Sequence, residues 1–165
     1  MGEILDSGNR TEFDTGAVRD MQGDKGRCDL MPLDVVSHLL FVEAPLSESV
    51  LDNLEYYRMN GEVEFLYKAV ARFIDEAFGR NKETAMLELS VHFRDGAEKY
   101  GENNWQKGLP EWSYISSAVR HYLKWRRGDK DERHDRAFMW NVVCLIWTAE
   151  NEINAAVRQS TILEK

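Results

Sequence analysis

The stretch AFMWNVVCLIWTA at residues 137–149 constrains the fold more than any other part of the chain. Its only polar side chains are those of Asn141 and Thr148, so a helix over these residues is apolar on every face. Such a helix is stable in a globular protein where other elements surround it. The stretch is shorter than the roughly 18 apolar residues that identify a membrane-spanning helix. We therefore expect it to form the central, buried helix of a helical protein.

Three other segments have the periodicity of amphipathic helices. Residues 62–78 place apolar side chains at i, i+3 and i+4 spacing, which gathers them on one stripe. This stripe consists of Phe65, Leu66, Val70, Phe73, Ile74 and Phe78. Residues 82–100 are expected to form a long helix capped by Asn81, and residues 112–127 a further helix closed by Gly128. The face of that further helix expected to point inward consists of Ile115, Ala118, Val119, Tyr122 and Leu123.

Shorter helices are expected after Pro32 and after a cap at Ser47 or Ser49, and a last long helix from about 131 to 157. No segment shows the alternating pattern of a strand, and the loops are short, so neighbouring helices should pack antiparallel. The predicted fold class is all-α, a helical bundle of about five to six helices with an extended N-terminal arm. Residues 1–31, rich in glycine and aspartate, are the arm, and residues 32–165 are the helical domain.

The composition limits what the chain can bind. A net charge of −8 repels the phosphate backbone, so we expect no nucleic-acid polymer as a partner. A local basic pocket or a metal ion could still bind a small polyphosphate. The N-terminus lacks the basic and apolar regions of a secretion signal, and we expect a cytoplasmic protein without membrane contact. Cys28 and Cys144 belong to no CxxC pattern and are expected to be free, buried thiols.

A cluster of acidic and imidazole side chains precedes the central stretch. Asp131, Glu132 and His134 lie where the last helix should begin, and Asn141 lies two turns beyond His134 on the same face. Oxygen and imidazole donors at one end of a buried helix suit Mg²⁺ or Mn²⁺. The alternative is a charged first turn, which the helix macrodipole stabilises by about 0.3–1 kcal/mol per acid, beside a structural histidine.

Two further groups could bind a nucleotide. Arg120 and His121 make one helix edge cationic, which suits either a phosphate clamp or a solvated basic edge. The segment at 96–108 could stack a base on Trp105 and offer lysines to phosphates, or it could simply end a helix with Trp105 in the core. Glu88 and His92, one turn apart on the preceding helix, are a weaker pair of metal donors.

Three longer motifs carry a resemblance. They are GDKGRCDLMPLDVV at 23–36, DGAEKYGENNWQKGLP at 95–110 and SAVRHYLKWRRGDKDERHDRAFMWNVVCLIW at 117–147. Together they resemble a phage family of dATP/dGTP diphosphohydrolases (MazZ-like, N-terminal domain), whose members resemble MazG-like all-α nucleotide pyrophosphohydrolases. The matching positions are Arg27, Asp29, Leu30, Pro32, Gly96, Lys99, Tyr100, Gly101, Asn104, Trp105, Lys107, Gly108, Arg120, His121, Gly128, Asp131, Glu132, His134, Ala137, Trp140 and Asn141.

The resemblance implies metal-dependent hydrolysis of a deoxypurine nucleoside triphosphate to the monophosphate and pyrophosphate, in phage control of the nucleotide pool. It implies Glu132, Asp131 and His134 as catalytic residues, and these three with Glu88 as ligands of Mg²⁺ or Mn²⁺. It also implies a set of substrate-binding residues, namely Arg27, Lys99, Tyr100, Asn104, Trp105, Lys107, Arg120, His121 and Asn141.

The sequence departs from the family pattern at two points. Arg133 stands where the family tends to have an acid, and the EExxE helix of MazG proteins is not seen. Two alternatives therefore stay open: a nucleotide-binding protein without catalysis, such as a phage sponge for a host signalling nucleotide, and a purely structural bundle. The five tryptophans and the helix apolar on all sides favour a homo-oligomer.

Overall fold

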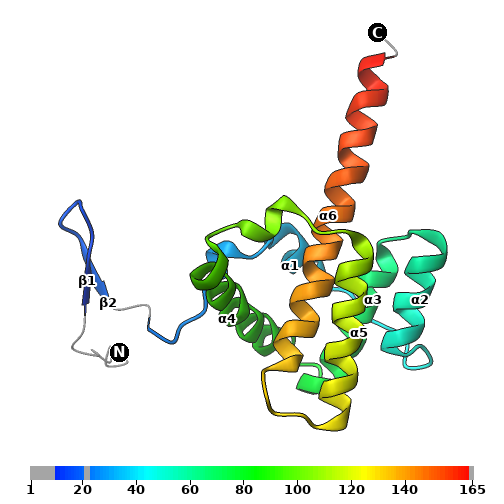
Figure 1. Cartoon of the computed structure of the whole chain (residues 1–165), viewed down its shortest axis with the longest axis horizontal. Helices are drawn as coiled ribbons and strands as arrows, with labels where there is room; N and C mark the ends of the chain where they lie inside the picture. The colour runs from blue at the N-terminus through cyan, green and yellow to red at the C-terminus, as the bar shows by residue number, and fades with distance from the viewer. Residues whose placement is uncertain (1–9, 21–22, 164–165) are drawn as a thin grey trace.

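The computed structural model describes residues 10–20 and 23–163, and the body of the protein is a bundle of α-helices (Figure 1). The elements follow in the order β1 (Arg10–Glu12), β2 (Val18–Asp20), 3-10 helix η1 (Cys28–Leu30), α1 (Leu33–Leu39), α2 (Val50–Asn60), α3 (Glu64–Phe78), α4 (Lys82–Tyr100), 3-10 helix η2 (Asn104–Lys107), α5 (Glu111–Arg127) and α6 (His134–Leu163). The predicted all-α bundle with an N-terminal arm is confirmed.

Side-chain caps fix where two of the helices begin. Ser49 accepts a hydrogen bond from the backbone N–H of Asp52, and the Asp52 carboxylate accepts one from the N–H of Ser49. Asn81 accepts from the N–H of Thr84 at the start of α4. These contacts pair backbone donors that the first turn of a helix leaves without partners. Both caps were expected from the sequence, with Ser49 rather than Ser47 beginning α2.

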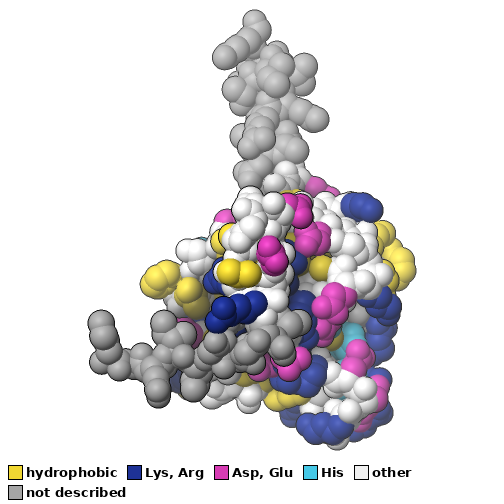
Figure 2. Space-filling model, turned by 90° about the vertical axis from the view of Figure 1, so that its left-hand side faces the viewer, with side chains coloured by type: hydrophobic (Ala, Val, Ile, Leu, Met, Phe, Trp, Pro, Cys, Tyr) yellow, Lys and Arg dark blue, Asp and Glu magenta, His cyan; other side chains and the backbone are white. Residues whose placement is uncertain are grey.

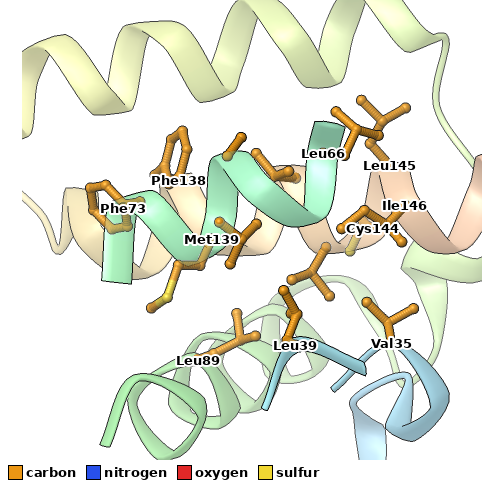
Figure 3. Close-up of a cluster of buried hydrophobic side chains, with 14 of the residues drawn as sticks. Val35, Leu39, Leu66, Phe73, Leu89, Phe138, Met139, Cys144, Leu145 and Ile146 are labelled. Atoms are coloured by element: carbon orange, nitrogen blue, oxygen red, sulfur yellow. The ribbon is translucent and has the colours of Figure 1, made fainter. Parts of the chain in front are cut away.

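Helix α6 is the centre of the bundle, as its composition predicts. It packs against α1, α3, α4 and α5. Figure 3 shows its buried side chains, among them Phe138, Met139 and Ile146, facing Phe73 of α3 and Leu89 of α4. The core therefore lies around the stretch that is apolar on every face, and the end of α6 extends past the other helices (Figure 1).

The boundaries of α6 differ from the prediction. The helix begins at His134 instead of near Asp131 and continues to Leu163 instead of ending near 157. Asp131 and Glu132 lie in the loop before the helix, and the N–H of Ala137 bonds to the carbonyl oxygen of Arg133. The two acids are therefore not members of the first helical turn, and they can turn back toward α5.

Helix α5 runs antiparallel to α6 and buries Tyr114, Ala118 and Tyr122. Leu123 was expected to point inward, but its exposed fraction is 52%. In an α-helix a residue four positions on is rotated by about 40°, because each residue turns by about 100°. The half-buried row of Ile115 and Val119 has therefore rotated toward solvent by the time it reaches Leu123.

The N-terminal arm has more structure than the sequence indicates. Strands β1 and β2 pair antiparallel, with Thr11 opposite Arg19, although no strand was expected. Three-residue strands are too short to show an alternating pattern. Further along, the N–H of Arg27 donates to the carbonyl oxygen of Ser90 on α4, at 3.1 Å. A Cβ on Gly26 would lie 1.8 Å from Ser90 Oγ, so only glycine fits this close approach. Residues 1–9 and 21–22 of the predicted arm lie outside the described residues.

The two cysteines are both free but differ in burial. Cys144 is buried in the core, as expected, whereas Cys28 is exposed, because η1 lies at the surface of the arm. Among the described residues, no helix has both the length and the apolar content that crossing a bilayer requires.

Candidate functional site

A cavity of about 550 Å³ lies between the end of α4, the segment around η2, and helices α5 and α6. It collects most of the residues that the sequence predicted for substrate binding. Those that line it are Tyr100, Asn104, Trp105, Arg120, His121 and Asn141, together with the predicted catalytic Glu132. Residues that lie as far apart as 30 and 141 in the sequence thus meet around one space.

The connection between α5 and α6 brings two histidines together. Gly128 ends α5 in the left-handed conformation, with a φ of 87°, and the chain returns directly into α6. His121 Nδ1 and His134 Nδ1 consequently lie 3.0 Å apart. Glu132 Oε1 lies 3.6 Å from the first of these nitrogens and 3.5 Å from the second. Three metal-ligating atoms therefore lie within 3.6 Å of one another beside the cavity.

Asp131 determines which nitrogen of His134 carries hydrogen. Its Oδ1 lies 2.8 Å from His134 Nε2, and its Oδ2 lies 2.8 Å from Lys124 Nζ. The Lys124 ammonium and then the His134 ring hold the pKa of Asp131 well below its ordinary value. An ionised carboxylate only accepts hydrogen bonds, so Nε2 must be the donor. In a neutral His134 ring this leaves the lone pair on Nδ1, which faces His121 and Glu132.

Burial keeps the paired imidazoles away from water. The exposed fraction of His134 is 2%, and His121 is half-buried in the cavity wall. Burial lowers the pKa of the His121 imidazole, and the nearby Glu132 carboxylate offsets part of this effect. A neutral imidazole is the form that ligates metal ions. Residues His121, Glu132 and His134 are called the histidine–glutamate cluster below.

A second group of donors, formed by Asp129, Asp131 and His134, lies on the other side of the same ring. Here the carboxylates already have cationic partners. Asp129 is paired with Arg127, and Asp131 is paired with Lys124. The histidine–glutamate cluster includes no lysine or arginine contact of this kind among the described residues, so it is the better of the two candidate metal centres.

The far part of the cavity is aromatic. Trp105, which is 8% exposed, meets Phe93 and Trp147 edge to face, at ring-centroid distances of 5.6 and 4.9 Å. Its Nε1 has no hydrogen-bond partner among the described residues. Trp112 and Tyr100 also line the cavity but are 73% and 62% exposed, so their rings are more accessible for stacking than that of Trp105.

A family model describing "dATP/dGTP diphosphohydrolase, N-terminal" matches residues 81–158. This segment of the chain is similar to that family. It runs from the cap of α4 into α6 and contains the histidine–glutamate cluster, Arg120 and the aromatic residues of the cavity. The family resemblance of the motifs at 95–110 and 117–147 is therefore confirmed. No curated protein and no solved structure matches the chain.

Within the family segment, Arg120 is the cation best placed for a ligand. It lines the cavity, and its Nη2 donates to the neutral Ser117 Oγ at 3.2 Å; no carboxylate of the described residues pairs with its charge. Asn141 is buried and donates through Nδ2 to the carbonyl oxygen of Ala137 at 2.8 Å. Its side-chain oxygen is left as an acceptor at the cavity wall.

Two predicted residues are already engaged by opposite charges. The Arg27 guanidinium binds Asp29 and Glu102, with nitrogen–oxygen distances of 2.7 and 2.9 Å. Glu88, predicted as a metal ligand, instead binds Arg133 and Arg136. Neither Arg27 nor Glu88 lines the cavity, and the structure does not bring Glu88 into either donor group. Figure 2 shows acidic and basic side chains intermixed over much of the face drawn.

Two predicted lysines lie outside the cavity wall. Lys107 is exposed on η2, and Lys99 Nζ lies 5.0 Å from the centroid of the Tyr100 ring. Sequence reasoning also missed residues that line the cavity. Trp112 belongs to a helical segment whose spacing gives no sign of a ligand, Trp140 was noted only as a match to the family pattern, and His92 was considered only as a partner of Glu88.

Proposed function

We propose that the protein hydrolyses purine nucleoside triphosphates, preferably deoxynucleotides, to the monophosphate and pyrophosphate with the help of a divalent metal ion. The observation that carries the proposal is one cavity with metal-ligating groups and an uncompensated arginine at one part and exposed aromatic rings at another. Apart from Leu30, the residues that line this cavity lie within the segment that matches the diphosphohydrolase family. Its volume of about 550 Å³ lies in the range typical of small-molecule sites.

The distribution of residues suggests how a nucleotide would lie. The base would stack on Tyr100 or Trp112, whose rings are accessible, and Asn104 would face the edge of the base. The phosphates would lie near His121, Glu132 and Arg120. The Arg120 guanidinium would neutralise phosphate charge through paired hydrogen bonds. Lys99 and Lys107 would reach the phosphates only by changing their present positions.

The reaction adds water across the bond between the α- and β-phosphates. A water oxygen bonds to the α-phosphorus, the α–β bridging bond breaks, and pyrophosphate leaves. A bound divalent ion would supply Lewis-acid stabilisation of the phosphate charge. Glu132 contacts both imidazoles through Oε1, so Oε2 is left to accept the proton of the attacking water. Asp131 would act by fixing the orientation of His134, so we assign it a positioning role and not direct contact with the reacting atoms.

The test is direct conversion of nucleotides. We would incubate the protein with each common dNTP and NTP in the presence of Mg²⁺, Mn²⁺ or EDTA and separate the products by ion exchange. We expect metal-dependent formation of purine monophosphate and pyrophosphate. Glu132→Gln should abolish turnover, and His38→Gln, a change at an exposed histidine on α1, should leave it unchanged. Unchanged turnover in Glu132→Gln would overturn the assignment of this residue, and no consumption of any nucleotide would overturn the activity.

A second candidate is nucleotide binding without hydrolysis. The observation that favours it is Arg133, which replaces a family acid and binds Glu88 and Asp135, so this position offers no ligand for a metal. The same assay separates the two functions. A sponge would bind a purine nucleotide in the presence of EDTA and return it intact, and Glu132→Gln would leave its affinity unchanged.

A further inference from the structure

We propose that the histidine–glutamate cluster binds one first-row transition-metal dication, such as Zn²⁺, Co²⁺ or Mn²⁺, in strong preference to Mg²⁺. The ligands are His121 Nδ1, His134 Nδ1 and Glu132 Oε1. The inference deepens the proposed function, on which it rests, because it names the class of ion that the hydrolysis would use. It changes the ligand set predicted from the sequence by adding His121 and by leaving out Glu88 and Asp131 as direct ligands.

The three ligand atoms are close enough to share one ion once the rings tilt, because the ring centroids lie 5.3 Å apart and the two Nδ1 atoms point at each other. The three ligand atoms form a triangle with sides of 3.0, 3.5 and 3.6 Å. A point in the plane of that triangle lies about 2.0 Å from all three atoms, which is the bond length of Zn²⁺ to imidazole nitrogen and carboxylate oxygen. An ion slightly above the plane would have bonds of about 2.1 Å. Water or phosphate oxygens could then complete its coordination from the cavity.

The donor types decide between classes of ion. Mg²⁺ is a hard ion that prefers oxygen ligands and retains several waters. Two imidazoles with one carboxylate form a softer set, which zinc, cobalt, nickel and iron bind more tightly. For a given site the affinity rises from Mn²⁺ through Co²⁺ toward the later ions, with Zn²⁺ tighter than Mn²⁺. We therefore expect Mg²⁺ to be the weakest of the four test ions.

The surroundings of His134 support the same conclusion. A metal-bound histidine usually donates its other ring N–H to a carboxylate, which orients the ring and raises its basicity. His134 has this arrangement, because Nε2 lies 2.8 Å from Asp131 Oδ1 and Asp131 is in turn held by Lys124. Asp131 is therefore a positioning residue that holds the hydrogen on Nε2 and leaves the His134 Nδ1 lone pair available to an ion.

The competing explanation is a hydrogen bond between the two imidazoles. Such a bond, from His121 Nδ1–H to His134 Nδ1, accounts for the 3.0 Å distance by itself. It does not require Glu132, whose Oε1 lies almost equally far from both nitrogens. The two explanations differ in outcome, since a purely structural pair would give no measurable affinity for a metal ion.

Ion binding can be tested without a nucleotide. We would treat the full chain with a chelator, remove the chelator, and titrate Zn²⁺, Co²⁺, Mn²⁺ and Mg²⁺ by calorimetry. The absorption spectrum of bound Co²⁺ would report nitrogen coordination. We expect one equivalent of transition metal and an affinity for Mg²⁺ at least about 100-fold weaker than that for Zn²⁺.

Variants assign the ligands. His121→Asn and Glu132→Gln should each lower the Co²⁺ affinity by about 100-fold or more and change its spectrum. Asp131→Asn should lower it by about 10- to 100-fold, because an outer carboxylate is lost while the three ligands stay. The matched control is His92→Asn, which changes another histidine of the same cavity that belongs to neither donor group. Its affinity should stay within about twofold of the parent.

Circular dichroism checks that each variant folds. If His121→Asn does not fold, Glu132→Gln tests the ligand assignment by itself, because Glu132 lies on an exposed loop. A protein that binds Mg²⁺ as tightly as Zn²⁺, or one whose affinity for Co²⁺ survives both ligand changes, would overturn the inference. Tight Co²⁺ binding without nucleotide hydrolysis would overturn the proposed function alone. Hydrolysis with Mg²⁺ that does not depend on His121 would overturn this inference alone.

Discussion

Exchanging the charges of Arg27 and Glu102 would show whether Arg27 binds phosphate or positions the segment that carries Asn104 and Trp105. The Arg27 backbone N–H bonds to the carbonyl oxygen of Ser90 on α4, and its guanidinium reaches Glu102, the second residue after the end of α4. The structure thus makes Arg27 a link between the arm and one wall of the cavity. The sequence, by contrast, predicted a direct contact with the triphosphate.

The expected change in KM follows from how exposed the Arg27–Glu102 ion pair is. The Arg27 and Glu102 side chains are 30% and 59% exposed, so solvent screens their ion pair. Pairs of this kind contribute about 0.2–1 kcal/mol, and the upper value corresponds to about fivefold in affinity. We expect Arg27→Glu to raise KM by up to about fivefold with little change in kcat. The double variant Arg27→Glu/Glu102→Arg should return KM to within about twofold of the parent, since Asp29 stays beside the new carboxylate.

Steady-state kinetics of pyrophosphate release measure the effect, and Arg58→Glu provides the matched control. Arg58 is an exposed arginine on α2 that forms an ion pair with Glu55, and it does not line the cavity. A direct contact with phosphate would be worth about 1.5–3 kcal/mol, or roughly 10- to 150-fold in KM. An increase of that size in Arg27→Glu that the exchange fails to reverse would refute the positioning role.

Three further predictions concern the core, the cavity and pH. Phe138→Ala should lower the free energy of unfolding by about 3–5 kcal/mol in urea titrations, because its ring is fully buried against Phe73, whereas exposed Phe41→Ala should change it little. Trp112→Ala should raise KM about tenfold without loss of stability, and Leu123→Ala on the same helix should not. Burial lowers the pKa of the His92 imidazole below its ordinary value of 6.5, so the metal-free protein should lose stability as the pH falls below 6.5. Urea unfolding midpoints at pH 7.5 and 5.5 measure this loss, and His92→Asn should reduce it.

Burial patterns made most of the fold predictable. The stretch at 137–149 had to lie at the centre, because a helix without a polar face is stable only when it is surrounded. Caps such as Ser49 and Asn81 were predictable because their hydrogen bonds are local. The strands of the arm and the direction of Leu123 were not, because both depend on a few residues and on what packs beside them.

The sequence predicted which residues line the cavity better than it predicted which residues pair with one another. Motif spacing identified Arg120, His121 and Asn141, and all three line the same cavity in the structure. Motif spacing could not show that Arg27 and Glu88 would be neutralised by residues far along the chain. Those pairings join segments separated by more than one helix, so they depend on tertiary packing.

The roles of Asp131 and Glu132 show most clearly why the ligand set could not be predicted. As neighbours in the sequence they look equivalent, and a helix beginning near Asp131 would have placed both in its first turn. Because α6 begins at His134, the loop before it directs Asp131 to Nε2 of the ring and Glu132 to Nδ1. Asp131 can thus orient the imidazole, while Glu132 can bind the same metal ion as the imidazole does. Which acid does which depends on the ring nitrogen that each one meets, and residue spacing does not contain that information.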